Sequence, residues 1–195
     1  LKPISIALDK LQKTSASIAD STEVWKTLEE EFHAEQFPRT VVTSMQDRMK
    51  QALTPAHYLA NILHPLYLGK KLSEDEIGIA MDYALKKTET CPSFMPMLVK
   101  YRAQSGPFVP PLFQHSLLNE VTAVEWWKSL THQIAKDAQA IAIQLISASA
   151  STAGLERIFS LFGLVHTEIR NRLGNEKAGK LVFVLQSLKS KPSAK

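Results

Sequence analysis

Apolar residues recur every three or four positions in one segment of the chain after another, and this spacing constrains the fold more than any other feature. It is the pattern of helices that each bury one face, and no stretch alternates with period two over the length that a sheet needs. Polar pairs of the capping-box type, Ser73 with Glu76 and Thr122 with Glu125, mark two helix starts. A chain of 195 residues is long enough for one domain or for two small lobes that share a core. We therefore predict an all-α fold, a helical bundle in two lobes.

Caps and prolines set the expected boundaries of individual helices. The second helix is expected to start at Asp20. A threonine followed by a proline opens a helix over 55–63, and the His-Pro pair that follows should end it. The segment 134–146 is apolar on nearly all sides, which predicts a central, buried helix.

Five prolines between residues 92 and 111 break the helical pattern, so this segment is the best candidate for a linker between the lobes. Within it, residues 94–101 are expected to form a short helix and residues 108–113 an extended strap anchored by aromatic side chains. A proline-rich segment can also be the ligand of a partner, but apolar neighbours favour packing against its own chain. The adjacent Trp126 and Trp127 cannot share one helix face. We expect one in the core and the other in a groove between the lobes or stacked on a nucleic-acid base.

Composition excludes several classes of protein. The single cysteine, Cys91, allows no internal disulfide and indicates a reducing, intracellular compartment. No apolar run approaches the length of a membrane span, and the N-terminus lacks the pattern of a signal peptide. The net charge of +4 and the pI of about 9.1 are compatible with a nucleic-acid partner without requiring one. Because the chain starts at Leu1 without a methionine, we expect it to be a piece of a longer protein.

Histidines and basic residues in the first half of the chain indicate no particular chemistry. His57 and His64 are seven residues apart, too far for a zinc pair on one helix turn, and we interpret both as structural. Arg39, Arg48 and Lys50 share the polar side of one expected helix, where they are either solvated or in contact with phosphate.

Glu156 is the acidic residue that stands out. It lies beside an apolar stripe that includes Leu155, Ile158 and Phe159, and small residues follow it one and two turns on. The residue three positions before it has no hydroxyl, which excludes a capping box, and no basic side chain stands one turn away on either side. A solvated surface glutamate is the alternative interpretation.

Several short motifs around Glu156 occur together in one known family. They are the run ASTAGLERIFS at 150–160, Gly163, RNRL at 170–173, the apolar run at 181–188 and the upstream Trp126-Trp127 pair. Together they resemble the C-terminal region of hAT-superfamily transposases, strongly over residues 124–188 and more weakly upstream. Two positions depart from the family, which usually has proline in place of Ser149 and serine or alanine in place of Gly154.

The resemblance implies a catalytic role for Glu156, as the third acidic residue of a DDE metal site on an RNase H-like core. Such enzymes cut and join DNA with two Mg²⁺ ions, which stabilise the attacking and leaving oxygens. One carboxylate cannot hold these ions, and the upstream aspartates all fall in helical or capping contexts: Asp9, Asp20, Asp47, Asp75, Asp82 and Asp137. The chain then corresponds to the end of the helical insertion plus the C-terminal helices, without the catalytic sheet. We expect no enzyme activity from it in isolation and no cofactor of its own, Mg²⁺ belonging to an intact parent.

The proline pattern and the resemblance together divide the chain into a helical lobe (1–105), a Pro-rich strap (106–121), a C-terminal region that resembles the family's dimerisation region (122–188) and a basic tail (189–195). The final helix presents apolar side chains on more than one side, which predicts a homodimer unless the N-terminal lobe covers them. The expected dimer contacts are Leu181, Phe183, Val184 and Leu188. The expected contacts with DNA phosphates are Arg157, Arg170, Arg172, Lys177 and Lys180. The alternative interpretation is that these charges are only solvated.

Two functions remain open at this point. In the first, the chain gives a full-length nuclear transposase its third catalytic acid, its dimer contact and contacts with the DNA backbone. In the second, it belongs to a domesticated derivative that uses only a helical protein-interaction surface and has no catalytic role. Neither function involves a membrane or a small-molecule substrate.

Overall fold

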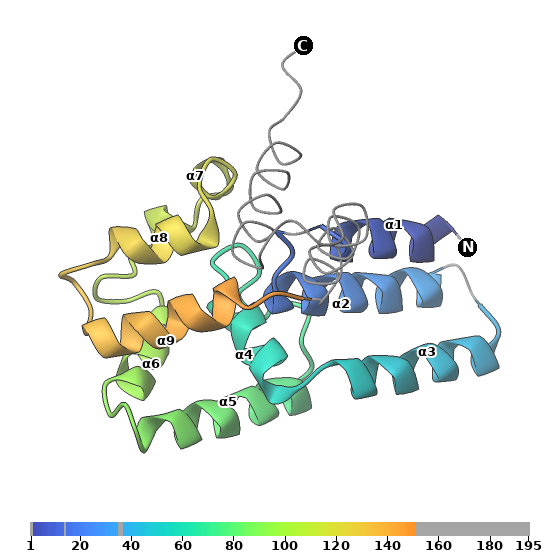
Figure 1. Ribbon diagram of the computed structural model, residues 1–195, viewed down its shortest axis with the longest axis horizontal. Helices are drawn as coiled ribbons and strands as arrows, with labels where there is room; N and C mark the ends of the chain where they lie inside the picture. Colours follow the sequence, from blue (N-terminus) through green and yellow to red (C-terminus); the bar gives the residue numbers. More distant parts are fainter. Residues whose placement is uncertain (1, 14, 35–36, 151–195) are drawn as a thin grey trace, which may run out of the picture. The chain divides into compact units, whose positions relative to one another are not determined.

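A computed structural model describes residues 2–13, 15–34 and 37–150, and these residues form nine α-helices and one 3₁₀ helix (Figure 1). They belong to the first of two units into which the chain divides, Leu1–Ser151. In chain order the helices are α1 (Lys2–Leu11), α2 (Ile18–Ala34), α3 (Arg39–Ala52), α4 (Pro55–Leu63), α5 (Glu74–Thr88), α6 (Phe94–Arg102), η1 (Pro110–Phe113), α7 (His115–Leu118), α8 (Ala123–Ser129) and α9 (Lys136–Ser147). The described residues contain no strand, which confirms the all-α prediction.

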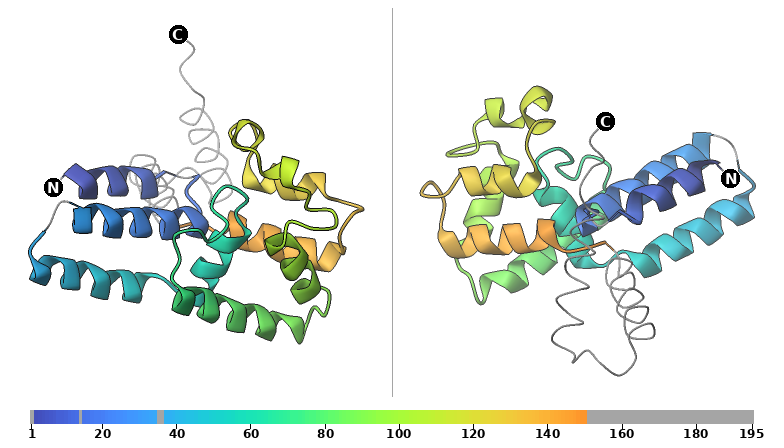
Figure 2. Two further views of the ribbon diagram at one scale, coloured as in Figure 1. Left: turned by 180° about the vertical axis from the view of Figure 1, so that it is seen from behind. Right: turned by 45° about the horizontal axis from the view of Figure 1, so that its top comes forward.

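Helix α4 is the centre of the described unit, and helices α2, α5 and α9 all pack against it (Figures 1 and 2). Leu59 and Leu63 are fully buried, as is most of the helix after its first turn. The predicted span of 55–63 is confirmed. At its start the Thr54 backbone N–H donates to Nδ1 of His57 over 3.3 Å, so a histidine occupies the place that glutamate usually takes in a capping box.

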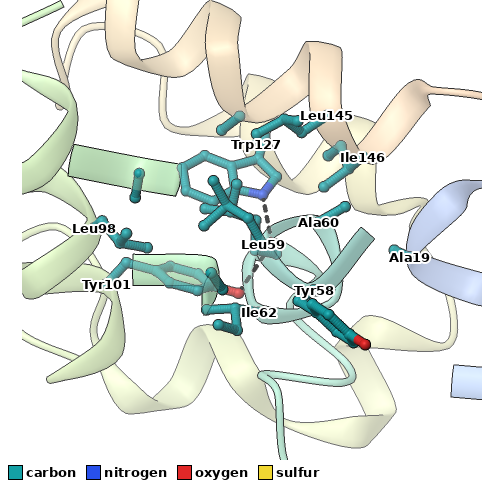
Figure 3. Close-up of a cluster of buried hydrophobic side chains, with 14 of the residues drawn as sticks. Ala19, Tyr58, Leu59, Ala60, Ile62, Leu98, Tyr101, Trp127, Leu145 and Ile146 are labelled. Carbon is teal, nitrogen blue, oxygen red and sulfur yellow. Dashed lines mark hydrogen bonds between the residues drawn. The ribbon is translucent and has the colours of Figure 1, made fainter. Parts of the chain in front are cut away.

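The last carbonyl of α4 lies in the core, where water cannot reach it. A helix leaves its final carbonyls without backbone partners, and a buried one needs a donor from elsewhere. Two aromatic side chains supply it, because Trp127 Nε1 and the Tyr101 hydroxyl both donate to the Leu63 oxygen, over 2.9 and 3.1 Å (Figure 3). The end of α4 is therefore held by residues 38 and 64 positions further along the chain.

Helix α9 is less buried than the sequence predicts. Ala138 and Ala142 face the core, whereas Ala140 and Gln144 on the opposite side are exposed. The prediction of a central, buried helix over 134–146 is therefore confirmed only in part, because α9 packs on α2, α4, α6 and α8 but leaves one side exposed.

Local capping signals are largely confirmed. Ser73 with Glu76 caps α5, and Thr122 with Glu125 caps α8, each by reciprocal bonds between a side chain and a backbone N–H. The start of α2 differs from the prediction, since the helix begins at Ile18 and Asp20 lies in its first turn.

The proline-rich segment is only partly as predicted. Helix α6 confirms the short helix expected over 94–101. Residues 110–113, however, form a 3₁₀ turn in place of an extended strap. Aromatic anchoring is confirmed by Phe108, which is fully buried.

Candidate functional site

The residues predicted to carry out function lie in 151–195, outside the described residues. They are Glu156, Arg157, Arg170, Arg172, Lys177, Lys180, Leu181, Phe183, Val184 and Leu188. The site that the structure describes is the stretch of chain that leads to them.

Residues 148–150 are fixed by a short antiparallel pairing with the residues that precede α2. The Ile18 backbone N–H donates to the Ala148 carbonyl over 2.8 Å, and the Ala150 N–H donates to the Ala16 carbonyl over 2.9 Å. Ser17 and Ser149 lie opposite each other in this bridge. The backbone is therefore anchored at a residue that precedes Glu156 by six positions in the sequence.

Ser149, a position that departs from the family, lies within this pairing. The two backbone hydrogen bonds on either side of it use groups of Ala148 and Ala150. Proline at position 149 would remove one backbone N–H and fix φ at about −65°.

Asp20, in the first turn of α2, contacts Ser17 of this bridge and also Tyr67. Its Oδ2 accepts bonds from both the backbone N–H and the hydroxyl of Ser17, each 2.8 Å long. Its Oδ1 accepts a 2.6 Å bond from the Tyr67 hydroxyl, and this contact adds to burial in raising the pKa of Tyr67. Both carboxylate oxygens are thus engaged within the protein. Asp20 holds the helix start and the bridge together.

His64 lies beside Tyr67 and Asp20. Its ring stacks on Tyr67, with centroids 4.0 Å apart and planes 19° apart. Burial lowers the pKa of His64 to about 4, against a weaker opposing effect of Asp20. A hollow of about 490 Å³ lies beside these groups and is lined mainly by Asp20, His64, Thr122, Val124, Ser147 and Ser149. Asp20 and Thr122, two of the polar residues that line the hollow, already accept hydrogen bonds in helix caps. The lining therefore does not indicate a particular ligand.

The described residues do not provide a site for Mg²⁺. No group of three histidine, cysteine or acidic side chains comes together among them. The six aspartates expected in helical or capping contexts all lie in helices, and Asp137, for example, accepts bonds from Ser93 Oγ and the Ala138 N–H. The prediction that these aspartates fall in helical or capping contexts is confirmed.

The two histidines set aside as structural are confirmed in that role. His57 caps α4, and burial lowers its pKa. His64 packs on Tyr67 as described above. The basic residues Arg39, Arg48 and Lys50 are all exposed on α3. Exposure is compatible with either interpretation of that face.

The adjacent tryptophans are both buried, although only one was expected in the core. Trp127 packs at the end of α4, where its Nε1 donates to the Leu63 carbonyl. Trp126 packs against the proline-rich segment, where its Nε1 donates to the Leu112 carbonyl over 2.8 Å. Phe108 stacks on Trp126 at a centroid distance of 6.3 Å, and Phe113 packs against it at 5.2 Å. Neither ring is available to stack on a base.

Sequence reasoning missed a buried lysine between α2 and α5. Lys26 is 9% exposed, and its ammonium lies 2.7 Å from Glu29 and 3.2 Å from Glu76. The spacing of Lys26 and Glu29 on one helix gave a local signal, but the contact with Glu76 joins residues 50 positions apart.

Comparison with known proteins identifies the C-terminal part of the chain. Residues 107–188 match the family model described as the hAT family C-terminal dimerisation region, which confirms the resemblance. Among the described residues this region includes η1, α7, α8 and α9. No curated protein matches the chain. None of the described helices combines the length and apolar character needed to cross a bilayer.

Proposed function

Because residues 107–188 match the hAT family C-terminal dimerisation region, we propose that the chain serves a hAT transposase, or a protein derived from one, as more than a dimer contact. In this proposal it also supplies Glu156 to a DDE site and touches the DNA backbone. The match over 107–188 is the observation that carries the proposal.

The family match supports the part of the proposal that concerns Glu156, because that residue lies within the matched range 107–188. Two backbone hydrogen bonds and the contacts of Asp20 hold residues 148–150, a few positions upstream of Glu156. In this proposal the other acids of such a site come from the parent protein, because the described residues bring no three histidine, cysteine or acidic side chains together.

Substitution of Glu156 in the intact parent tests the catalytic role. Glu156→Gln should abolish DNA cleavage and strand transfer while leaving the stability of this chain within about 2 kcal/mol of the natural protein. Glu120→Gln, an exposed change elsewhere in the same region, is the control. Unchanged strand transfer by the Glu156→Gln protein would leave the chain as a helical interaction module without a catalytic role.

Contact with DNA phosphates is expected to be weak, independent of sequence and sensitive to salt, because it rests on charge. The net charge of +4 supports it. Replacing Arg170 and Arg172 by alanine should weaken binding to duplex DNA at low salt and reduce its salt dependence, as measured by fluorescence anisotropy. The matched control removes Arg39 and Arg48, two exposed arginines of α3. Binding that survives the first pair of changes and is lost with the second would place the contact on α3.

A further inference from the structure

One segment of the surface has the composition of an interface. Residues 103–119, which we call the uncharged segment, contain no lysine, arginine, aspartate or glutamate. Charged residues make up 22% of the whole chain, so a stretch of this length would ordinarily contain about four. Depletion of charge is a compositional signal of the centre of a protein interface.

The inner side of the uncharged segment is firmly held. Phe108 is fully buried and meets the Tyr101 ring edge to face at 5.3 Å. The bond from Trp126 to the Leu112 carbonyl and the packing of Phe113 on Trp126 fix the segment a few residues further on. The backbone between these anchors is therefore not free to move inward and bury its outer side chains.

The outer side of the segment is exposed and apolar. Val109 is 45% exposed and Leu117 is 37% exposed, and Pro110 and Pro111 are exposed beside them. Proline has a fixed φ, and the anchors hold its neighbours, so ordering this surface on association costs little conformational entropy. A rigid apolar surface of this kind suits a protein partner.

We propose that the uncharged segment is a self-contact, packed against the same segment of a second copy of the chain. The proposal rests on the dimer function above and names a surface for it, because the segment overlaps the start of the matched dimerisation region. Near a two-fold axis each residue lies close to its own copy, so any charge there would face a like charge. A surface without charges avoids this repulsion, whereas a charged partner such as DNA would gain nothing from it. A stable dimer buries about 800 Å² per copy, more than so short a segment offers, so the segment is one part of the contact.

Sedimentation velocity over a micromolar concentration series tests the contact. Val109→Asp places two like charges at the two-fold axis and should weaken the dimer at least tenfold. The matched control is Val99→Asp on α6, which introduces the same charge at a valine that is 57% exposed and lies outside the dimerisation region. A dimer with unchanged affinity after Val109→Asp would overturn the proposal.

Cross-linking provides a second measurement that does not depend on weakening the dimer. Val109→Cys in a Cys91→Ser background should form a covalent dimer under mild oxidation, and Val99→Cys in the same background should not. A natural chain that stays monomeric throughout would overturn the dimer function itself. A dimer that dissociates with Phe183→Glu but tolerates Val109→Asp and forms no cross-link would overturn only the role of the uncharged segment.

Discussion

At the scale of single residues, several polar side chains of the described unit cap helix starts and join neighbouring segments. Asp20 is typical, because one carboxylate caps α2, holds Ser17 beside the 148–150 bridge and accepts the Tyr67 hydroxyl. An aspartate with both oxygens engaged in this way is a poor metal ligand. These contacts explain why Asp20 is unsuited to be one of the catalytic acids.

His64 makes the stability of the unit depend on pH. Burial holds its pKa near 4 in the folded chain, below the usual value of 6.5, so the unfolded chain binds the proton more tightly. The contribution of His64 to stability should be complete above pH 6.5 and should disappear as the pH falls to 4. Urea unfolding at a series of pH values measures it.

Within the part of the chain that the structure describes, Asp20 and Tyr67 face His64, and the control must keep both. His64→Gln removes the proton-binding group, so its stability should change less between pH 6.5 and 4 than that of the natural chain. Equal slopes for the two proteins would contradict the assignment to His64.

At the scale of helices, ion pairs fasten α2 to α5. Lys26 bridges Glu29 of its own helix and Glu76 of α5, and Glu76 also accepts a bond from the Ser73 N–H in the α5 cap. Lys26→Ala should cost about 1–2 kcal/mol of unfolding free energy, because it leaves two half-buried carboxylates without their cation. Lys86→Ala on the exposed side of α5 should change stability by less than about 0.5 kcal/mol. Denaturant titration compares the two.

Helix boundaries show which parts of the fold are predictable from sequence. The span of α4 and the caps of α5 and α8 could be predicted from residues within a few positions, and these predictions are confirmed. The buried carbonyl at the end of α4 nevertheless takes its partners from the distant Tyr101 and Trp127. The start of α2 was wrong by two residues because Ser17 and Asp20 cap each other across three positions, a local signal that lies just upstream of the predicted start. The pairing of residues 16–18 with 148–150 joins residues more than a hundred positions apart and leaves no local signal.

The exposed side of α9 and the burial of Trp126 were missed for the same reason. Helix α9 is apolar on most sides but leaves one side exposed. Trp126 is covered by the segment that contains η1, which was itself expected to be extended. In the candidate site, the structural roles of His57 and His64 could be inferred from the sequence. The roles of Glu156, the basic residues and the apolar residues of the final helix remain predictions, as do the domain boundaries.

At the scale of the whole described unit, Trp127 joins the matched dimerisation region to the central helix. Its indole fills the core and donates to Leu63 at the end of α4. Trp127→Phe should cost about 2–3 kcal/mol, from lost volume and a lost buried hydrogen bond, and the loss should appear in every helix packed on α4.

Hydrogen exchange measures how many helices lose protection after Trp127→Phe, with Trp25→Phe as the control. Trp25 is only half-buried, so its replacement should affect fewer amides. Loss of protection confined to α8 after Trp127→Phe would show that the two parts of the chain unfold separately.

The bridge between residues 16–18 and 148–150 has a consequence for how the protein is made. A ribosome adds residues in order, and most domains fold as soon as their parts have emerged. Here the corner at the start of α2 is completed by residues that are synthesised more than a hundred positions later. Until then the surfaces of α2 and α4 that pack on α9 remain uncovered on the nascent chain, so we expect these non-local contacts to form last.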